Sequence, residues 1–247
     1  MPGRLHDKVA VVTGGSRGIG RAIVEKFITE GASVTNLDLS WTGVALAPFV
    51  RADVTREADV QAAMDEVRNT CGRIDILVNN AGVNACFDAE TMTESQWEGV
   101  FAVDLKGAWL CAKHVLTGMK ERRQGSIVNI ASIHASLTMS GMFPYAAAKS
   151  GLVGLTRSLA LDYARHGIRV NAVSPGWTRT SLVEEWFGSQ EDPAAAEASV
   201  IKAHPMCRLA TPMEVANLVA FVASDEASAI TGSSFSVDCG LGIQFAT

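Results

Sequence analysis

The sequence predicts an α/β fold in which strands and helices alternate around a parallel sheet. First, residues Val9–Thr13 form a β-branched run without polar alternation, which is typical of a strand buried on both faces. Second, a glycine-rich turn at 14–20 leads into apolar residues at helical spacing that end at Gly31. Third, similar patterns recur along all 247 residues with no linker rich in proline, glycine, serine or charge. We therefore expect a single domain over residues 1–247.

Seven segments are expected to be strands, with helical periodicity between them. The expected strands are Val9–Thr13, Ser33–Asp38, 48–54, 74–78, 125–131, 170–173 and Ser234–Val237. Capping boxes at Thr93 and Thr211 predict two helix starts, and the first of these helices is expected to run to about Arg123. The alternation breaks down at 178–210. We expect this connection to form a substrate lid, because long connections over an active edge are usually functional.

The glycine-rich turn is expected to bind the phosphates of a dinucleotide. It lies between a buried strand and a helix, so backbone N–H groups and the positive end of the helix dipole meet there. Its spacing is Gly-x-x-x-Gly-x-Gly rather than the common G-x-G-x-x-G. The residues expected at the phosphates are Gly14, Ser16, Arg17, Gly18, Ile19 and Gly20.

The end of the second expected strand predicts which cofactor binds. Asp38 can accept hydrogen bonds from the adenosine ribose hydroxyls, and its charge repels a 2′-phosphate. Arg17 favours the opposite choice, because a guanidinium in the glycine turn can meet that phosphate. Leu39 follows Asp38, so the second cation expected of a phosphate site is missing. We therefore expect NAD, with NADP as the less favoured alternative.

Composition and charge argue against several other classes of protein. The formal net charge is −5 and no cluster of Lys or Arg occurs beyond 120–123, so nucleic acid is not an expected partner. No apolar run approaches membrane-spanning length and no apolar signal segment opens the sequence, which predicts a cytoplasmic protein without a membrane partner. The five cysteines are scattered without a C-x-x-C pair, so we expect neither disulfides nor a metal site.

A serine, a tyrosine and a lysine are the candidate catalytic residues. Ser132 directly follows the fifth expected strand, and Pro144 favours a helix start because its φ is already helical. Tyr145 and Lys149 then lie one turn apart on the same face. An ammonium beside a phenol favours the phenolate, which suits a general acid or base. The pair alone is also typical of an aromatic ring packed on a lysine stem, but Ser132 and the glycine turn favour catalysis.

With these motifs in place, the whole chain resembles the short-chain dehydrogenases/reductases. The matching pieces are residues 13–20, Asp53-Val54, 79–82, Ser132, Tyr145-x-x-x-Lys149, Pro175-Gly176 with Thr180, and 237–240. Each piece is weak alone, whereas their shared order and spacing are specific. The resemblance implies a Rossmann-type, doubly wound, seven-stranded parallel sheet. It also implies a homotetramer built on the helices that contain Trp109 and Leu152.

The resemblance implies a role for each motif. Tyr145 exchanges a proton with an alcohol or carbonyl, Ser132 hydrogen-bonds that oxygen, and Lys149 holds the nicotinamide ribose, while the cofactor takes or gives a hydride. The further residues implied at the cofactor are Asp53, Val54, Asn80, Ala81, Gly82, Pro175, Gly176, Thr178 and Thr180. The expected activity is therefore that of an NAD(P)-dependent oxidoreductase acting on CH–OH groups of a small molecule.

Asp104 departs from the family pattern, which has asparagine at this place. That asparagine is thought to shape the helix so that its backbone carbonyl holds a water in a proton relay to the lysine. Asp104 still supplies a backbone carbonyl, and its carboxylate can stabilise the charge of Lys149. We include Asp104 as a fourth catalytic residue. Cys239, another departure where glycine is usual, is interpreted as structural.

Oxidation of an aldose or polyol is the leading interpretation of the substrate. NAD is mostly oxidised in the cytoplasm, and the lid resembles that of bacterial aldose and polyol dehydrogenases in carrying Trp-Phe followed by Glu-Asp-Pro. A sugar needs several polar partners and an aromatic face. The residues expected to line its pocket are Asn84, His134, Trp177, Arg179, Glu185 and Trp186.

Two alternatives to the sugar interpretation follow from the same residues. An apolar carbonyl such as a steroid, a cyclic alcohol or an acyl thioester would suit Met139, Met142 and Phe143 beside Tyr145. A regulator that binds NAD without turnover is the alternative from another class of protein. The intact Ser132, Tyr145 and Lys149 argue against that regulator.

Overall fold

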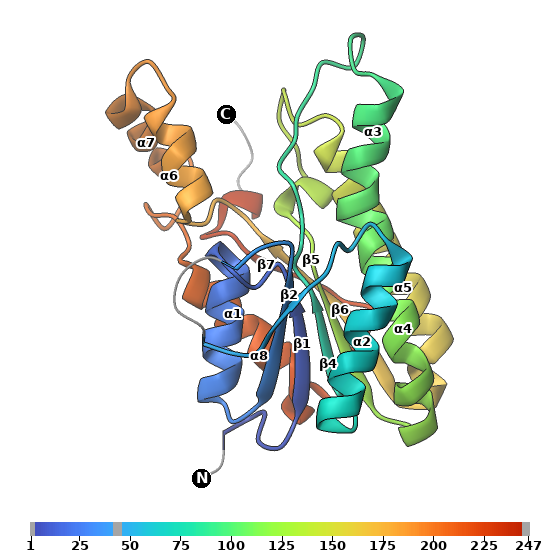
Figure 1. Ribbon diagram of the computed structural model, residues 1–247. Coiled ribbons are helices and arrows are strands. Elements are labelled where there is room, and N and C mark those ends of the chain that lie inside the picture. The colour runs from blue at the N-terminus through green and yellow to red at the C-terminus, as the bar shows by residue number, and fades with distance from the viewer. Residues whose placement is uncertain (1–2, 42–45, 244–247) are drawn as a thin grey trace.

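The computed structural model describes residues 3–41 and 46–243, and the two ends of the predicted domain 1–247 and residues 42–45 lie outside the described part. Its centre is a seven-stranded, wholly parallel sheet in the order β3-β2-β1-β4-β5-β6-β7 (Figure 1). The strands are β1 (Val9–Thr13), β2 (Ser33–Asp38), β3 (Phe49–Arg51), β4 (Ile76–Asn79), β5 (Gly125–Ile130), β6 (Ile168–Pro175) and β7 (Ser234–Val237). The predicted Rossmann-type fold is confirmed.

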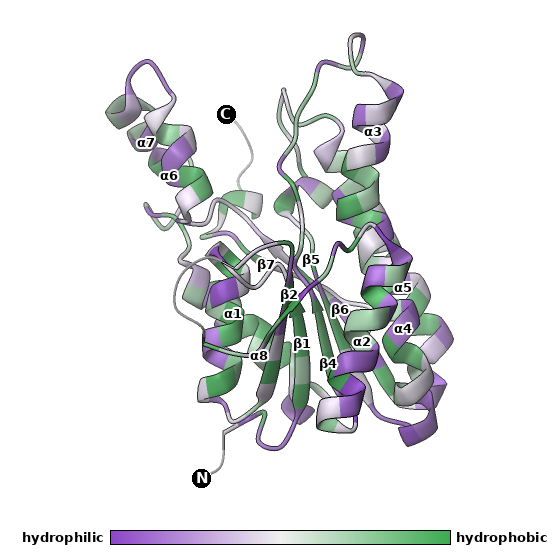
Figure 2. Ribbon diagram, in the orientation of Figure 1, coloured by the Kyte–Doolittle hydropathy of each residue, from purple (hydrophilic) through white to green (hydrophobic). Residues whose placement is uncertain are grey.

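The sheet is covered by helices on both faces, which explains the unbroken apolar run of β1. Val9 and Val11 belong to one core, with α2 (Glu57–Cys71) and α4 (Gly107–Arg122). Ala10 and Val12 point into the opposite core, with α1 (Gly18–Thr29) and α8 (Pro212–Ala223). Successive side chains of a strand face opposite sides, so each must be apolar when both sides are covered. Figure 2 shows the central strands as hydrophobic and the outer helix faces as largely hydrophilic.

Strand order reverses between β1 and β4, and this point locates the site. Val11 of β1 is in register with Thr35 of β2 on one side and with Leu77 of β4 on the other. The connections that leave these strands therefore diverge at their carboxyl ends. Ligands of open α/β sheets bind in the crevice at such a switch point.

The long helix predicted from Thr93 to about Arg123 is divided by a π-helical turn. The capping box of Thr93 with Gln96 is confirmed and opens α3 (Glu94–Phe101). Residues Ala102–Lys106 then form the π-helical turn, and α4 follows it. Apolar periodicity does not report such a change of hydrogen-bond register, so the sequence indicated one continuous helix. Turns of this kind recur at functional sites, and this one carries Asp104.

Two short helices project beyond the carboxyl edge of the sheet within the predicted lid at 178–210. They are α6 (Ser181–Gly188) and α7 (Pro193–Lys202), which stand apart from the main body in Figure 1. Side chains cap both, with Thr180 at the start of α6 and Asp192 at the start of α7. Among the helices of the described residues, none is both long and apolar enough to cross a membrane.

Candidate active site

The ends of β1 and β4 are tied together at the carboxyl edge of the sheet. Thr13 Oγ1 accepts hydrogen bonds from the backbone N–H groups of Asn80 and Ala81, both at 3.0 Å. The Asn80 side chain returns two bonds, to the carbonyl oxygens of Thr13 at 3.0 Å and Gly14 at 2.9 Å. The glycine turn and the turn after β4 therefore hold one another in place, and both belong to the predicted cofactor site.

The glycine turn fits a pyrophosphate. Gly14 and Gly18 have φ values of +65° and +56°, a region that favours glycine. A Cβ on Gly20 would clash with the Gly14 carbonyl oxygen and the Asn80 side chain, so the start of α1 lies directly against the turn. No side chain of the described residues caps α1, which leaves its first N–H donors available to an anion.

Thr180 covers the other side of this turn. A Cβ on Gly18 would lie 3.5 Å from Thr180 Cγ2, which places the start of α6 beside the start of α1. Hydrogen bonds hold the residues between β6 and α6, including those from Gly176 N–H to the Val237 oxygen at 3.0 Å and from Thr178 Oγ1 to the Gly176 oxygen at 3.2 Å. Pro175 ends β6 at the same edge. Of the predicted cofactor residues in this segment, Thr180 lies against the glycine turn, while Gly176 is held beside the end of β7.

Asp38 closes the base of the glycine turn from the end of β2. Its carboxylate accepts hydrogen bonds from the N–H groups of Ser16 at 3.1 Å and Leu39 at 2.8 Å. Asn36, which the sequence analysis missed, accepts from the Gly15 N–H at 2.9 Å and donates to Ser16 Oγ at 3.1 Å. The sequence signal that could have identified Asn36 is an amide side chain within an otherwise apolar strand. The Leu39 side chain is 58% exposed, so an apolar surface flanks the Asp38 carboxylate.

Asp53 and Val54 have largely structural surroundings at the end of β3. Asp53 Oδ1 accepts bonds from Thr55 N–H at 2.9 Å and Thr55 Oγ1 at 2.7 Å, which closes a turn before α2. Val54 is buried, and a Cβ on Gly107 would lie 2.9 Å from its Cγ2. None of these contacts tests the expectation that Asp53 and Val54 bind the cofactor, which stays a prediction.

Ser132, His134 and Tyr145 are neighbours at the end of β5. Ser132 opens a short 3₁₀ turn, and its Oγ accepts the His134 N–H at 3.2 Å. The His134 ring lies 6.0 Å from the Tyr145 ring in an edge-on arrangement. Tyr145 is the first residue of α5 (Tyr145–Tyr163), after Pro144 as the cap. Burial lowers the pKa of His134, which favours its neutral form at pH 7.

Lys149 lies one turn further along α5 and is buried in an ion pair. Its Nζ is 5.5 Å from the centre of the Tyr145 ring. It donates to Asp104 Oδ1 at 3.0 Å and to the Ile130 carbonyl oxygen at 3.2 Å. An ammonium has three N–H donors, so one remains for a ligand. Burial acts to lower the Lys149 pKa, but Tyr145 and Asp104 outweigh it and the pKa is raised, which keeps the ammonium charged.

Asp104 reaches this ion pair from the π-helical turn. Its side chain is fully buried, and it also accepts the Val83 N–H at 3.3 Å. A Cβ on Gly82 would lie 2.8 Å from Asp104 Oδ1, which accounts for the small residue in the Asn-Asn-Ala-Gly turn. Burial raises the pKa of Asp104, while Lys149 and the Val83 N–H partly oppose that rise.

A buried chain of amides supports this edge of the sheet and was also missed. Asn79 Nδ2 donates to Asn129 Oδ1 at 2.8 Å, and Asn129 Nδ2 donates to Thr156 Oγ1 at 2.8 Å. These bonds join β4, β5 and the middle of α5. Fully buried polar side chains in apolar strands, as at Asn79 and Asn129, are the sequence signal for such a chain.

The residues predicted to bind substrate lie in different surroundings in the structure. His134 lies against Tyr145, and Trp177 packs on Trp186 with ring centres 4.9 Å apart. Arg179 instead pairs with Glu184 at 2.8 Å and Glu197 at 2.5 Å, which links α6 to α7. Asn84 and Glu185 are exposed.

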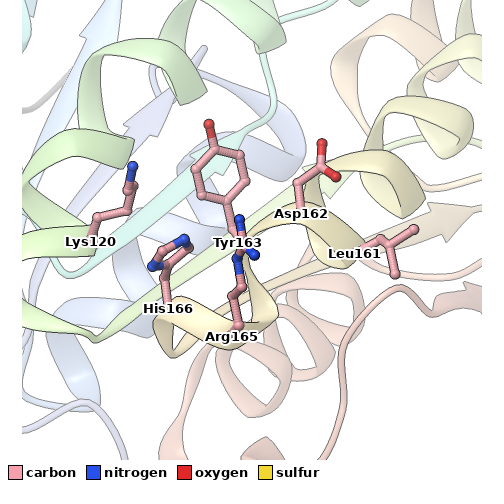
Figure 3. Close-up of a pocket in the computed structure, with 6 residues that line it drawn as sticks. All are labelled: Lys120, Leu161, Asp162, Tyr163, Arg165 and His166. Carbon is pink, nitrogen blue, oxygen red and sulfur yellow. The ribbon is translucent and has the colours of Figure 1, made fainter.

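A separate pocket of about 360 Å³ lies away from this site. It is formed at the far end of α5 and the end of α4, as Figure 3 shows, by Lys120, Leu161, Asp162, Tyr163, Arg165 and His166. Tyr163 ends α5 whereas Tyr145 begins it, so none of the predicted catalytic side chains lines this pocket. Within residues 3–41 and 46–243, no cluster of His, Cys, Asp or Glu could hold a metal ion.

The fold is a doubly wound parallel sheet with a glycine turn at the start of α1, which no side chain of the described residues caps. Ser132 and Tyr145 lie near the end of β5, with the buried Lys149 beside the Tyr145 ring. Together these features define a nucleotide-dependent oxidoreductase. The chain belongs to the short-chain dehydrogenase/reductase family, whose members use NAD or NADP. A family described as Enoyl-(Acyl carrier protein) reductase matches residues 14–242.

The chain is similar to three known proteins over almost their whole length. The chain is 38% identical to 2-(S)-hydroxypropyl-CoM dehydrogenase 3 of Xanthobacter autotrophicus, over 98% of this chain and 99% of that protein. It is 36% identical to the 3-oxoacyl-[acyl-carrier-protein] reductase FabG of Vibrio harveyi, over 96% and 98%. The ligand-free structure of Thermoplasma acidophilum aldohexose dehydrogenase superposes with a TM-score of 0.94 at 40% identity, over 98% and 97%.

Proposed function

We propose that the chain is an NAD-dependent dehydrogenase that oxidises a secondary alcohol or hemiacetal, with an aldose or polyol as its substrate. The observation that carries the chemistry is the placement of Tyr145 with the buried Lys149 ammonium 5.5 Å from its ring and Ser132 at the adjoining turn. When bound, NAD supplies the hydride acceptor.

Each of these side chains has one proton-handling task in the proposal. Ser132 Oγ accepts the His134 N–H, so its own hydroxyl hydrogen remains free to bond the substrate oxygen. Tyr145 removes the proton of that alcohol as a phenolate, which the neighbouring Lys149 ammonium stabilises. The remaining N–H of Lys149 would hold the nicotinamide ribose. Asp104 completes the proposed site through its ion pair with Lys149.

The choice of NAD rests on the charge at the end of β2. The Asp38 carboxylate is fixed by two backbone N–H donors beside the exposed Leu39 side chain. A fixed carboxylate suits ribose hydroxyls and repels a 2′-phosphate, whereas Arg17 is exposed and favours that phosphate. NADP remains the less favoured cofactor.

Support for a sugar comes from the residues near Tyr145 and from one similar structure. The His134 ring beside Tyr145 offers a polar partner, and the Trp177–Trp186 pair offers an aromatic face. Asn84, Glu185 and Arg179 complete the proposed polar lining, with 178–210 as the lid. The similarity to the aldohexose dehydrogenase agrees with this substrate class.

A second candidate substrate is an apolar alcohol or carbonyl. Leu137 and Met139 are at least half exposed, at 50% and 56%, and Phe143 is 37% exposed beside Trp97, with ring centres 5.8 Å apart. Leu137, Met139 and Phe143 belong to the segment between Ser132 and Tyr145. They would favour a hydrophobic substrate, and the relative FabG is named as a 3-oxoacyl-[acyl-carrier-protein] reductase.

We further propose a cytoplasmic homotetramer that does not bind nucleic acid. Trp109 of α4 is 45% exposed and Leu161 of α5 is 81% exposed, so these two helices carry apolar surface that other subunits could cover. Leu152 itself is buried within the subunit, so the contact would use the outer faces of α4 and α5. Sedimentation measurements on the purified protein test the assembly.

A substrate panel tests the proposed function. NAD reduction is followed by absorbance with aldoses, polyols, cyclic alcohols and 3-hydroxyacyl thioesters at saturating NAD. We expect oxidation of at least one aldose or polyol, with kcat/KM above that for every hydrophobic alcohol. Silence on all sugars together with turnover of a hydrophobic alcohol would establish the second candidate instead.

A further inference from the structure

Asp104 and Lys149 form a buried ion pair next to Tyr145, so their two charges act on the proposed catalytic residue. The two side chains are 3.0 Å apart, and their exposed fractions are 0% and 5%. The Asp104 carboxylate has two further contacts, both with the Val83 N–H, at 3.3 and 3.4 Å. Its main partner is therefore the same ammonium that faces the Tyr145 ring.

Few other ionisable groups face this pair. Tyr145 and Asp104 are the groups whose charge acts on Lys149, and Lys149 is the group whose charge acts on Asp104. The His134 ring approaches Tyr145 from the 3₁₀ turn, and burial favours its neutral form. From β5 the pair receives a backbone carbonyl, that of Ile130, and from the turn after β4 a backbone N–H, that of Val83.

We propose that Asp104 is a positioning residue that sets the working pH of Tyr145: its carboxylate holds Lys149 in place and offsets the field of the ammonium, so the phenolate forms at a higher pH than it would beside a neutral side chain. This inference rests on the proposed function for Tyr145 as the proton acceptor. It assigns to Asp104 an effect that arises from its negative charge rather than from its backbone carbonyl.

The sign of the effect follows from electrostatics. A buried carboxylate disfavours the loss of a further proton nearby, whereas an ammonium alone favours it. Neighbouring charges within about 4–6 Å shift titrations by about 1–3 pH units. Replacing Asp104 with asparagine removes the negative charge and keeps a side-chain oxygen for Val83 and Lys149. The coupled group of Tyr145, Lys149 and residue 104 then releases its proton more readily.

The consequence concerns both directions of the reaction. With Asp104 ionised, a larger share of Tyr145 is protonated at a given pH, and that form donates a proton to a carbonyl. Alcohol oxidation needs the deprotonated form, so its rate rises with pH over a more alkaline range. At a given pH, Asp104 thus raises the share of enzyme that can donate a proton to a carbonyl and lowers the share that can accept one from an alcohol.

The chain offers an unusually direct test because it contains two tyrosines, Tyr145 and Tyr163. In a Tyr163→Phe background, the near-ultraviolet absorbance of phenolate reports Tyr145 alone and needs neither cofactor nor substrate. We expect Asp104→Asn in this background to move the phenolate titration to lower pH by about one unit or more. The rise of kcat/KM for oxidation with pH should move by the same amount.

Two controls separate charge from structure. Asp162→Asn removes one negative charge from the exposed, far end of the same helix and should leave both pH profiles unchanged. Asp104→Glu retains the negative charge and should keep the phenolate titration near that of the Tyr163→Phe protein, whatever its effect on kcat. Thermal melting of each variant confirms that the titrations are made on folded protein.

The outcomes distinguish this inference from the proposed function. An unmoved phenolate titration in Asp104→Asn overturns the inference, even if the protein is an active dehydrogenase. A shift to lower pH supports it, even if no sugar or hydrophobic alcohol is oxidised and the proposed function fails. A shift to higher pH also overturns it. If Asp104→Asn does not fold, Asp104→Ser in the same background decides by the same titration.

Discussion

The Asn80 side chain donates to the Gly14 carbonyl oxygen at 2.9 Å, which makes the turns after β4 and β1 a single structural unit. The start of α1 is packed against that unit at Gly20, where a side chain would meet both groups. Cofactor binding and folding stability are therefore expected to depend on the same contact.

Gly20→Ala is expected to damage both properties. Its Cβ would overlap backbone and an anchored amide, which cannot yield as a flexible side chain does, so the cost is about 1–3 kcal/mol of stability. We expect a clearly lower melting temperature and at least about tenfold weaker NAD binding, equivalent to about 1.4 kcal/mol. The matched control is Gly99→Ala in α3, where no described atom lies within 4 Å of the new Cβ. Its melting temperature should stay equal or rise, because alanine favours a helix by about 0.5–1 kcal/mol.

Tyr145→Phe is expected to separate catalysis from cofactor binding. The change removes the proton acceptor and leaves the ring, its helix position and the Lys149 ion pair with Asp104 in place. We expect kcat to fall by about 10²–10⁴-fold, which is the usual contribution of a general base to the reaction rate. Calorimetric titration should give an NAD affinity within about twofold of wild type. An equal activity in the variant would contradict the assignment, and inactivity of both proteins on every alcohol would revive the regulator that only binds NAD.

Asp38→Asn is expected to weaken the preference for NAD. The amide can still accept one of the two backbone hydrogen bonds, but the charge that repels a 2′-phosphate is lost. The ratio of kcat/KM for NAD over NADP should fall by about tenfold, corresponding to about 1.4 kcal/mol. Arg17→Gln serves as the opposing variant, because it should raise the same ratio. A wild-type enzyme that already prefers NADP would show that Arg17 outweighs Asp38.

Two roles for Arg179 can be distinguished by experiment: linking the two lid helices, or the predicted direct contact with the substrate. Its guanidinium joins Glu184 and Glu197, so Arg179→Gln loosens α6 from α7. Since the three side chains are partly exposed, we expect a modest effect, a rise in KM of about two- to fivefold or up to about 1 kcal/mol. Glu197→Gln breaks the same link without touching Arg179. Matching rises in KM indicate that Arg179 acts through the lid, and a rise in Arg179→Gln alone indicates direct contact with substrate.

Much of the fold was predictable because buried strands and helices have regular patterns of apolar residues in the sequence. Strands covered on both faces are apolar at most positions, as in residues 9–12, and helix starts such as Thr93 and Thr211 carry reciprocal caps. The π-helical turn at Ala102–Lys106 was not predictable from the pattern of apolar residues. It changes a backbone hydrogen-bond register without changing which residues are apolar.

The site was predictable in its chemistry and less so in its contacts. The glycine turn, Ser132, Tyr145 and Lys149 could be identified because each motif has a fixed spacing within one element or at a strand end. Asn36 and the Asn79–Asn129–Thr156 chain were missed, because their partners lie on other elements. For Arg179, sequence position near the lid indicated a substrate contact, while the structure places acidic partners from α6 and α7 around it.

The sequence by itself determined the parallel sheet, the glycine turn and the placement of Tyr145 and Lys149 on one helix, since these depend on local periodicity and on residues one helical turn apart. Only the tertiary structure decided that Asp104 lies 3.0 Å from Lys149 in a fully buried ion pair. The physical reason is that the pairing joins a π-helical turn to a separate helix. Its distance depends on how α3, α4 and α5 pack, and no local pattern specifies that packing.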